Sequence, residues 1–360
     1  MIRYGIVGSG MMGQEHIRNI ALLEGTAIVA VADPHEAMRA EAAAQAGDGA
    51  KAFTDHRDLL SADLCDAYVV AAPNDLHRDL MLDLIAAGKP ILCEKPLCTT
   101  TVDCQRVSAA ADRAGVPVWV AMEYRYMPAI AALKSRLDAG VAGPPQMIAI
   151  REHRFPFLDK IGDWNRFNAR TGGTLVEKCC HFWDLMRLML QSDPVRVFAS
   201  AAADVNHRDE RHDGRVPDII DNAYVIVDFA SGARGMLDLC MFAEGAHWQE
   251  IVAVTGPKAR VEARVPGPPR FEVGGASHES EIAVADRAQR HEVVERVDID
   301  PDILDAGDHH GSTFYQHRHF RDLVRDGRRD PAVSLADGTW AVRVGEAAER
   351  SARSRTVVQL

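Results

Sequence analysis

A glycine-rich turn near the start of the chain has the spacing of a nucleotide-phosphate site. The segment Gly-Ser-Gly-Met-Met-Gly at residues 8–13 directly follows an apolar run at residues 2–7, and Asp33 ends a second apolar run. Glycines permit a tight turn that brings main-chain N–H groups to a pyrophosphate at a helix N-terminus, and the carboxylate accepts hydrogen bonds from a ribose. We therefore predict that a dinucleotide contacts Gly8, Gly10, Met11, Met12, Gly13 and Asp33.

The residues around Asp33 favour NAD over NADP. A carboxylate at this position would repel a 2′-phosphate, and the following Pro34 and His35 provide no adjacent arginine to bind one.

A lysine follows a short apolar run at residues 91–93, in the turn Glu94-Lys95-Pro96. Ligands bind at the carboxyl edge of a parallel sheet, so Lys95 is placed to hydrogen-bond a substrate hydroxyl, and partial desolvation would lower its pKa. The alternative is a surface lysine at a strand end.

An acid-x-x-x-His pattern provides a candidate base. If residues 174–188 form one helix, Glu177, His181 and Asp184 project from the same face. The surrounding residues are mostly apolar, which favours a partly buried imidazole over a surface ion pair. Glu177 would then orient the ring of His181 and stabilise its protonated form, as suits a general base near neutral pH.

Composition excludes several classes of protein. The 360 residues are 47% hydrophobic and carry a formal net charge of -11, so they can form a sizeable core but would repel nucleic acid. No apolar stretch is long enough to cross a membrane, and the first predicted strand leaves no room for a leader, so we expect a cytoplasmic protein.

The cysteine and histidine patterns predict neither disulfides nor a metal site. The seven cysteines form no CxxC pair, so we expect reduced thiols, with the adjacent Cys179 and Cys180 as packing residues. Histidines cluster at residues 207–212 and 309–319 without a recognised ligand spacing, and we expect them in solvated loops.

The elements that must position these residues fall into two groups. Strand and helix patterns alternate through residues 1–122, which predicts a doubly wound parallel sheet of Rossmann type. Within it, Asp33 is expected to cap a helix that begins at Pro34, and Thr100 with Asp103 to cap another.

After residue 122, five strand-like runs follow one another, at residues 146–152, 195–202, 222–229, 235–241 and 248–255. They predict an α+β domain over residues 123–360 with a large, mainly antiparallel open sheet. Residues 204–221 and 266–280 are expected to be surface loops. A closing helix at residues 335–351 could pack back on the first domain.

Taken together, these motifs resemble the glucose-fructose oxidoreductase, inositol dehydrogenase and rhizopine-catabolism family, written Gfo/Idh/MocA. The resemblance spans nearly the whole chain. It rests on the glycine-rich start, on Ala-Pro-Asn-Asp-Leu-His at residues 72–77, on Gly-Lys-Pro-Ile-Leu-Cys-Glu-Lys-Pro at 88–96, on the Gly-Gly to His segment at 172–181, and on Ala-Ala-Glu-Arg-Ser at 347–351.

The resemblance implies roles for further residues. Lys95 and His181 would be catalytic, with Glu177 standing where the family usually has Asp. The nicotinamide half of the cofactor would be flanked by Ala72, Pro73, Asn74, His77 and Glu94. Arg125 would face the cofactor or substrate, and substrate contacts would come from Tyr126, His153 and Trp164 in addition to Lys95 and His181.

The implied activity is an NAD-dependent oxidation of a secondary alcohol in a sugar, sugar derivative or cyclitol, with His181 as base. Two alternatives remain open: a glycosidase that uses an internal NAD redox cycle, and a non-catalytic sensor that binds dinucleotide. The resemblance also implies a homodimer or homotetramer, paired through the open sheet of the second domain.

Overall fold

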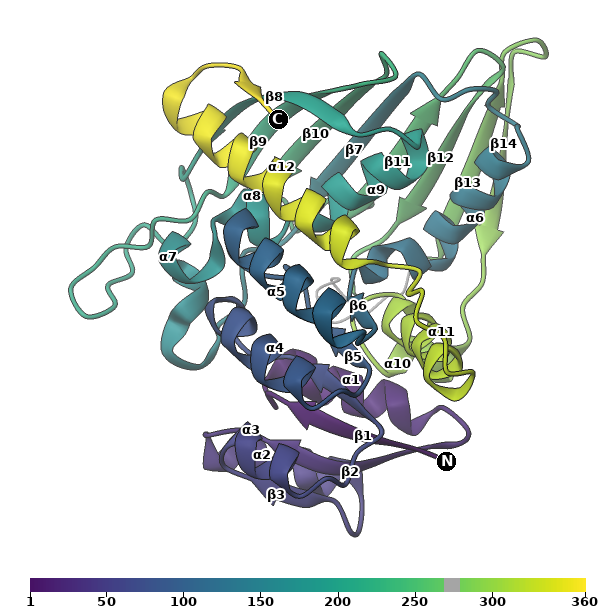
Figure 1. Ribbon diagram of the computed structural model, residues 1–360. Coiled ribbons are helices and arrows are strands. Elements are labelled where there is room, and N and C mark those ends of the chain that lie inside the picture. Colours follow the sequence, from purple (N-terminus) through teal and green to yellow (C-terminus); the bar gives the residue numbers. More distant parts are fainter. Residues whose placement is uncertain (269–278) are drawn as a thin grey trace.

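Two β-sheets organise the chain, one formed by its first third and one by the remainder (Figure 1). The computed structural model describes residues 1–268 and 279–360. Part of the predicted loop at 266–280 therefore lies outside the described residues.

The first sheet has six parallel strands in the order β3-β2-β1-β4-β5-β6, which is the doubly wound order with a switch point beside β1. Its strands are β1 Ile2–Val7, β2 Thr26–Ala32, β3 Lys51–Phe53, β4 Ala67–Val70, β5 Ile91–Cys93 and β6 Val118–Val120. The strands are apolar and largely buried, as expected where helices cover both faces.

Helices form one layer on each side of this sheet. Contacts link α1, α2 and α11 in one layer and α3, α4 and α5 in the other. Their bounds are α1 Met11–Ala21, α2 Glu36–Ala46, α3 His56–Ser61, η1 Asn74–Leu76, α4 His77–Ala86, α5 Thr101–Ala114 and α11 Ser312–Arg325.

The second sheet has nine strands in the order β14-β13-β12-β11-β7-β10-β9-β8-β15. All neighbours are antiparallel except β7 and β10, so the predicted fold class is confirmed. The strands are β7 Met147–His153, β8 Pro194–Ala202, β9 Asn222–Phe229, β10 Arg234–Cys240, β11 Glu250–Thr255, β12 Ala259–Val265, β13 Ser280–Asp286, β14 His291–Val297 and β15 Val358–Gln359.

Helices cover one face of the second sheet (Figure 1). The remaining helical segments are η2 Glu123–Tyr126, α6 Pro128–Asp138, η3 Ile161–Arg166, α7 Asn168–Thr171, α8 Thr174–Glu177, α9 Cys180–Leu190, α10 Pro301–Asp305 and α12 Leu335–Ser354. Of these, α6, α9 and α12 pack on the sheet. The closing helix α12 also contacts α5 and β6, so it bridges both sheets.

Two local predictions are wrong. Asp33 does not cap a helix that begins at Pro34: α2 begins at Glu36, and the Asp33 carboxylate instead accepts main-chain hydrogen bonds. Residues 174–188 are not one helix, because Lys178 and Cys179 separate α8 from α9.

No helix in the described part of the chain combines the length and the apolar character needed to cross a membrane.

Candidate active site

The glycine-rich turn leaves room for a phosphate at one position only. Gly8 has φ +93°, and a Cβ there would meet the main chain of Ala71 and Ala72, while a Cβ at Gly13 would meet the carbonyl of Gly8. A Cβ at Gly10, by contrast, would find no atom within 4 Å. Gly8 and Gly13 are therefore needed to close the turn, and Gly10 keeps its outer side open for a pyrophosphate at the start of α1.

Asp33 is held in a fixed orientation beside this turn. Its carboxylate accepts a hydrogen bond from Ser9 N at 2.7 Å and another from His35 N at 2.8 Å. The expectation that no arginine adjoins it is wrong in space, because the Arg39 guanidinium donates to the carbonyl of Asp33 at 2.7 Å. The first turn of α2 brings residue 39 back over residue 33, which sequence adjacency does not reveal.

His77 and Glu94 brace the loops predicted to flank the nicotinamide. The two ring nitrogens of His77 lie 2.9 Å from the carbonyls of Ala72 and Pro96, so the ring lies between two loops and donates to one of these carbonyls when neutral. Glu94 pairs with His16 at 3.0 Å and accepts from Lys95 N at 3.1 Å. Burial would raise the pKa of Glu94, but these partners lower it, so the carboxylate stays charged.

Four more predicted cofactor residues lie at the starts of helical segments. Met11 and Met12 open α1, and Pro73 precedes η1, which begins at Asn74. The side-chain nitrogen of Asn74 is buried without a hydrogen-bond partner.

Lys95 reaches across to the second half of the chain. Its ammonium donates to the carbonyl of Glu177 at 3.4 Å. Burial would lower the pKa of Lys95, but Cys180, Glu94 and Glu177 raise it above its ordinary value. The expected lowering is therefore wrong, and Lys95 is a cation and hydrogen-bond donor at neutral pH.

Glu177 does not orient His181. A break at residues 178–179 separates the two residues into different helices, and Oε2 of Glu177 is buried without a hydrogen-bond partner. Its Oε1 lies 3.9 Å from the ammonium of Lys160. Burial raises the pKa of Glu177, although Lys160 and Lys95 oppose the shift. Lys160 was missed by sequence reasoning, since a lone lysine in an irregular segment carries no signal.

His181 is held by a ring and not by a carboxylate. Its imidazole stacks on Tyr124 with centroids 4.0 Å apart and planes 9° apart, and Nδ1 is buried without a partner. Burial, with the charges of Lys95 and Lys178, lowers the pKa of His181 well below its ordinary value. The imidazole is therefore neutral and able to accept a proton.

The remaining predicted residues divide into two groups. Arg125 makes hydrogen bonds of 2.6 and 2.5 Å to Asp184 and another to the Ala332 carbonyl, so it ties η2 to α9. Tyr126 packs on Trp119 and His319. Trp164, by contrast, lies under the ammonium of Lys160 at 4.5 Å.

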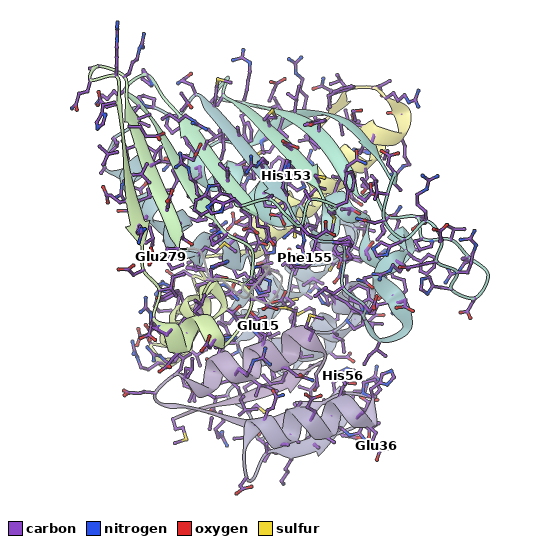
Figure 2. All side chains as sticks on the ribbon, turned by 180° about the vertical axis from the view of Figure 1, so that it is seen from behind. Glu15, Glu36, His56, His153, Phe155 and Glu279 are labelled. Carbon is purple, nitrogen blue, oxygen red and sulfur yellow. The ribbon has the colours of Figure 1, made fainter. Side chains whose placement is uncertain are left out.

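His153 ends β7 and pairs with Asp238 at 3.2 Å. Figure 2 labels His153 on the second sheet, above Phe155, which lies closer to the first domain.

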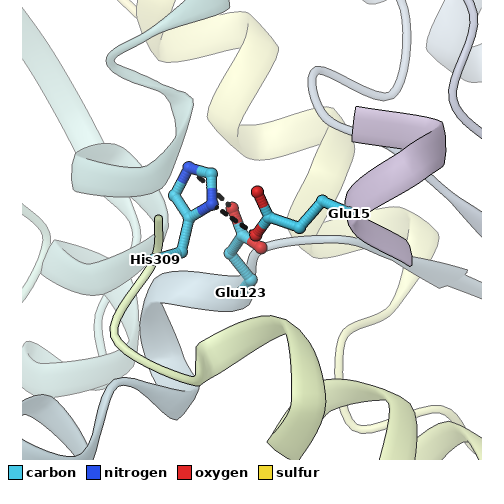
Figure 3. Close-up of side chains that lie close together, drawn as sticks. All are labelled: Glu15, Glu123 and His309. Carbon is cyan, nitrogen blue, oxygen red and sulfur yellow. Dashed lines mark hydrogen bonds and ion pairs between the residues drawn. The ribbon is translucent and has the colours of Figure 1, made fainter. Parts of the chain in front are cut away.

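A charged triad lies nearby, formed by Glu15, Glu123 and His309 (Figure 3). His309 Nδ1 bonds Glu15 at 2.8 Å, its Nε2 lies 3.7 Å from Glu123, and the Thr313 hydroxyl lies within hydrogen-bond distance of both carboxylates, 2.9 Å from Glu15 and 2.8 Å from Glu123. Although burial opposes it, the two glutamates raise the pKa of His309 to about 10. The imidazolium thus supplies the cation between them.

The solvated-loop prediction is wrong for part of the second histidine cluster: His310 and His317 are buried. Both lie near α11, which packs against α1.

Comparison with known proteins fits this geometry. The family profile described as "Oxidoreductase family, NAD-binding Rossmann fold" matches residues 2–122, and that of its C-terminal alpha/beta domain matches residues 134–360. The chain belongs to the Gfo/Idh/MocA family. It is an oxidoreductase with NAD as its cofactor.

Relatives of this Gfo/Idh/MocA protein include named enzymes. It is 30% identical to the rhizopine catabolism protein MocA of Rhizobium meliloti, over 71% of this chain and 76% of that one. It is 26% identical to the myo-inositol 2-dehydrogenase of Thermotoga maritima, over 100% of this chain and 98% of that one. An NAD binding oxidoreductase structure from Klebsiella pneumoniae aligns with TM-score 0.80 and 25% identity, over 99% and 98% of the two chains.

Proposed function

We propose that the protein oxidises a secondary alcohol of a sugar, sugar derivative or cyclitol, with NAD as hydride acceptor and His181 as base. The main support is a group of polar atoms with unused hydrogen-bonding capacity at one place. Nδ1 of His181 and Oε2 of Glu177 have no partner, and the Lys95 ammonium makes a single hydrogen bond of 3.4 Å. Buried polar atoms are normally satisfied, and the hydroxyls of a polyol would supply partners to these groups.

Each residue has a role that its charge allows. The neutral imidazole of His181 takes the hydroxyl proton as the carbinol C–H bond breaks, and the product is a ketone. The Lys95 ammonium donates a hydrogen bond to the same oxygen and stabilises the negative charge that develops there. Glu177 and Lys160 are placed to bind neighbouring hydroxyls. The bound nicotinamide supplies the hydride acceptor.

The substrate class is proposed from relatives and residue types together. Several relatives are inositol 2-dehydrogenases, which suggests a polyol. A ring rich in hydroxyls also suits a site that contains both donors and acceptors, such as Lys95, Lys160 and Glu177.

A polyol panel tests this function. We expect NADH absorbance to rise with at least one sugar or cyclitol. His181→Gln should lower kcat by about 10²–10⁴-fold, whereas NAD binding, followed by fluorescence or calorimetry, should be unchanged. Undiminished turnover in this variant would contradict the role of His181. Release of free sugar without net NADH would favour the internal redox cycle, and NAD binding without any turnover would favour the sensor.

We further propose a homodimer or homotetramer. The face of the second sheet opposite the helices exposes Tyr224, Ile226 and Met236, which are 65%, 52% and 43% exposed. An apolar patch of this kind on a sheet typically marks an interface. Light scattering should give at least twice the 39.4 kDa chain mass, and Ile226→Asp should reduce it.

A cytoplasmic location is part of the proposal. All seven cysteines are free and six of them are buried, as is usual in a reducing compartment.

A further inference from the structure

Behind the imidazole of His181 lies a buried polar array that the proposed reaction does not use. The Lys178 ammonium donates to the Tyr124 hydroxyl at 2.6 Å and pairs with Glu152 at 2.7 Å. The Tyr124 hydroxyl in turn donates to Glu250 at 3.2 Å. These four side chains are at most 5% exposed.

The array is assembled from four separate parts of the fold. Tyr124 lies in η2, Lys178 in the break between α8 and α9, Glu152 on β7 and Glu250 on β11. Glu152 and Glu250 face each other across the strand pair. Like charges at opposed positions destabilise a sheet, and burial together with Glu152 raises the pKa of Glu250 to about 8.

Such an arrangement is costly, and its position suggests why it is present. Buried charges destabilise a fold unless they are well paired, and apolar residues would fill the same space at less cost. Groups with strongly shifted pKa values gather at functional sites. Here Tyr124 joins the array through its hydroxyl, and its ring stacks on the imidazole of His181.

The stack of Tyr124 on His181 orients the imidazole, which is the role that was expected of the Glu177 carboxylate. Glu177 makes no hydrogen bond to the imidazole, and Nδ1 of His181 has no partner. The parallel ring of Tyr124, 4.0 Å away, is thus the contact that sets the plane of the imidazole. The break in the helix at residue 178 is also what carries Lys178 inward to the Tyr124 hydroxyl.

We propose that Tyr124 is a positioning residue for His181, held in place by Lys178, Glu152 and Glu250. Its catalytic meaning rests on the proposed function, but the positioning itself does not. Several cationic groups act on the same imidazole: Lys95, Lys178, His309 and Arg154 all disfavour its protonated form. Within the array, Lys178 therefore both contacts the Tyr124 hydroxyl and contributes to the neutral state of the imidazole.

Proton NMR of the full protein with ¹³Cε1-labelled histidine tests the positioning without reference to activity. The His181 signal is assigned by its loss in His181→Gln. In the wild type we expect it to be shifted upfield by the ring current of Tyr124. Tyr124→Leu should abolish that shift, whereas Tyr124→Phe, which keeps the ring but loses the hydroxyl that contacts Lys178 and Glu250, should keep part of it. A wild-type signal at the usual position, or one that Tyr124→Leu leaves unmoved, overturns the proposal.

Kinetics on an accepted polyol give the second readout. Tyr124→Leu should lower kcat about tenfold or more with little change in KM, because misplacing a base affects the transition state more than binding. Tyr124→Phe should restore most of kcat. Equal rates in wild type and Tyr124→Leu overturn the positioning role. If no polyol is oxidised at all, the proposed function fails while the NMR result still decides the stack.

Discussion

The ammonium of Lys95 meets the carbonyl of Glu177 at 3.4 Å. Lys95 follows strand β5 of the first sheet, and Glu177 is the last residue of α8. A second link, from Arg170 to Asp75 at 2.9 Å, joins the same two parts nearby. The candidate site is thus closed by contacts between side chains and loops that are far apart in sequence.

Lys95→Met should lower kcat/KM by about 10²-fold, because the cation opposite the developing oxyanion is lost. Lys95→Arg should recover part of the activity, since arginine keeps the charge but not the shape. Because the pKa of Lys95 is raised above 10.5, the wild-type rate should show no loss from Lys95 deprotonation between pH 7 and pH 10. Steady-state kinetics over that range check this, and full activity in Lys95→Met would exclude the role.

Gly10 and Gly13 should respond differently to substitution by alanine. Gly10→Ala places its Cβ in open space, so stability should be unchanged while NAD affinity falls roughly tenfold, or about 1.4 kcal/mol. Gly13→Ala drives its Cβ into the carbonyl of Gly8 and should destabilise the fold by about 1–3 kcal/mol. Thermal unfolding and calorimetric titration separate the two effects, and equal losses of stability would argue against the open site at Gly10.

Asp33→Ser should shift the cofactor preference toward NADP. The substitution removes the carboxylate that repels a 2′-phosphate and leaves Arg39 beside it. We expect NADP affinity to rise tenfold or more and NAD affinity to fall. The double variant Asp33→Ser with Arg39→Ala is the matched control and should lose the gain. If the gain persists in the double variant, Arg39 plays no part in cofactor discrimination.

The triad of Glu15, Glu123 and His309 should make stability depend on pH. The pKa of His309 is raised from 6.5 to about 10, so its contribution is complete below pH 6.5 and is lost as the pH rises toward 10. His309→Asn should therefore lower the free energy of unfolding by about 1–3 kcal/mol at pH 6, and the difference from wild type should shrink by pH 10. Urea unfolding at both pH values measures this, and a constant difference would contradict the assignment.

Much of the first domain could be predicted because local signals and tertiary structure agree there. The strand at residues 91–93 and the capping of α5 by Thr100, which accepts from Asp103 N, occur as predicted. In the second sheet, β9 Asn222–Phe229 also matches its prediction to the residue. In each case alternation, capping chemistry or a buried apolar run fixes the element without help from distant residues.

The site itself was predicted less completely, for a physical reason. Helix periodicity paired Glu177 with His181, but buried contacts of Lys178 with Tyr124 and Glu152 accompany a break in that helix. Strands β12, β13 and β14 were missed, since charged residues interrupt their apolar pattern and β14 is largely exposed. Tyr124 and Lys160 reach their places through irregular turns that no residue spacing encodes, and Arg39 reaches Asp33 through the first turn of α2.

The residues of the candidate site come from two separate parts of the chain, and this has a consequence for engineering. The glycine turn, Asp33 and Lys95 all precede residue 96, whereas Lys160, Trp164, Glu177 and His181 all follow residue 150. A chimera that joins this N-terminal part to the later part of another relative would keep the cofactor site of this protein. It would take its substrate selectivity from the relative. The junction would need to preserve Arg170 opposite Asp75, a carbonyl within reach of Lys95, and the packing of α11 and α12 against the first domain.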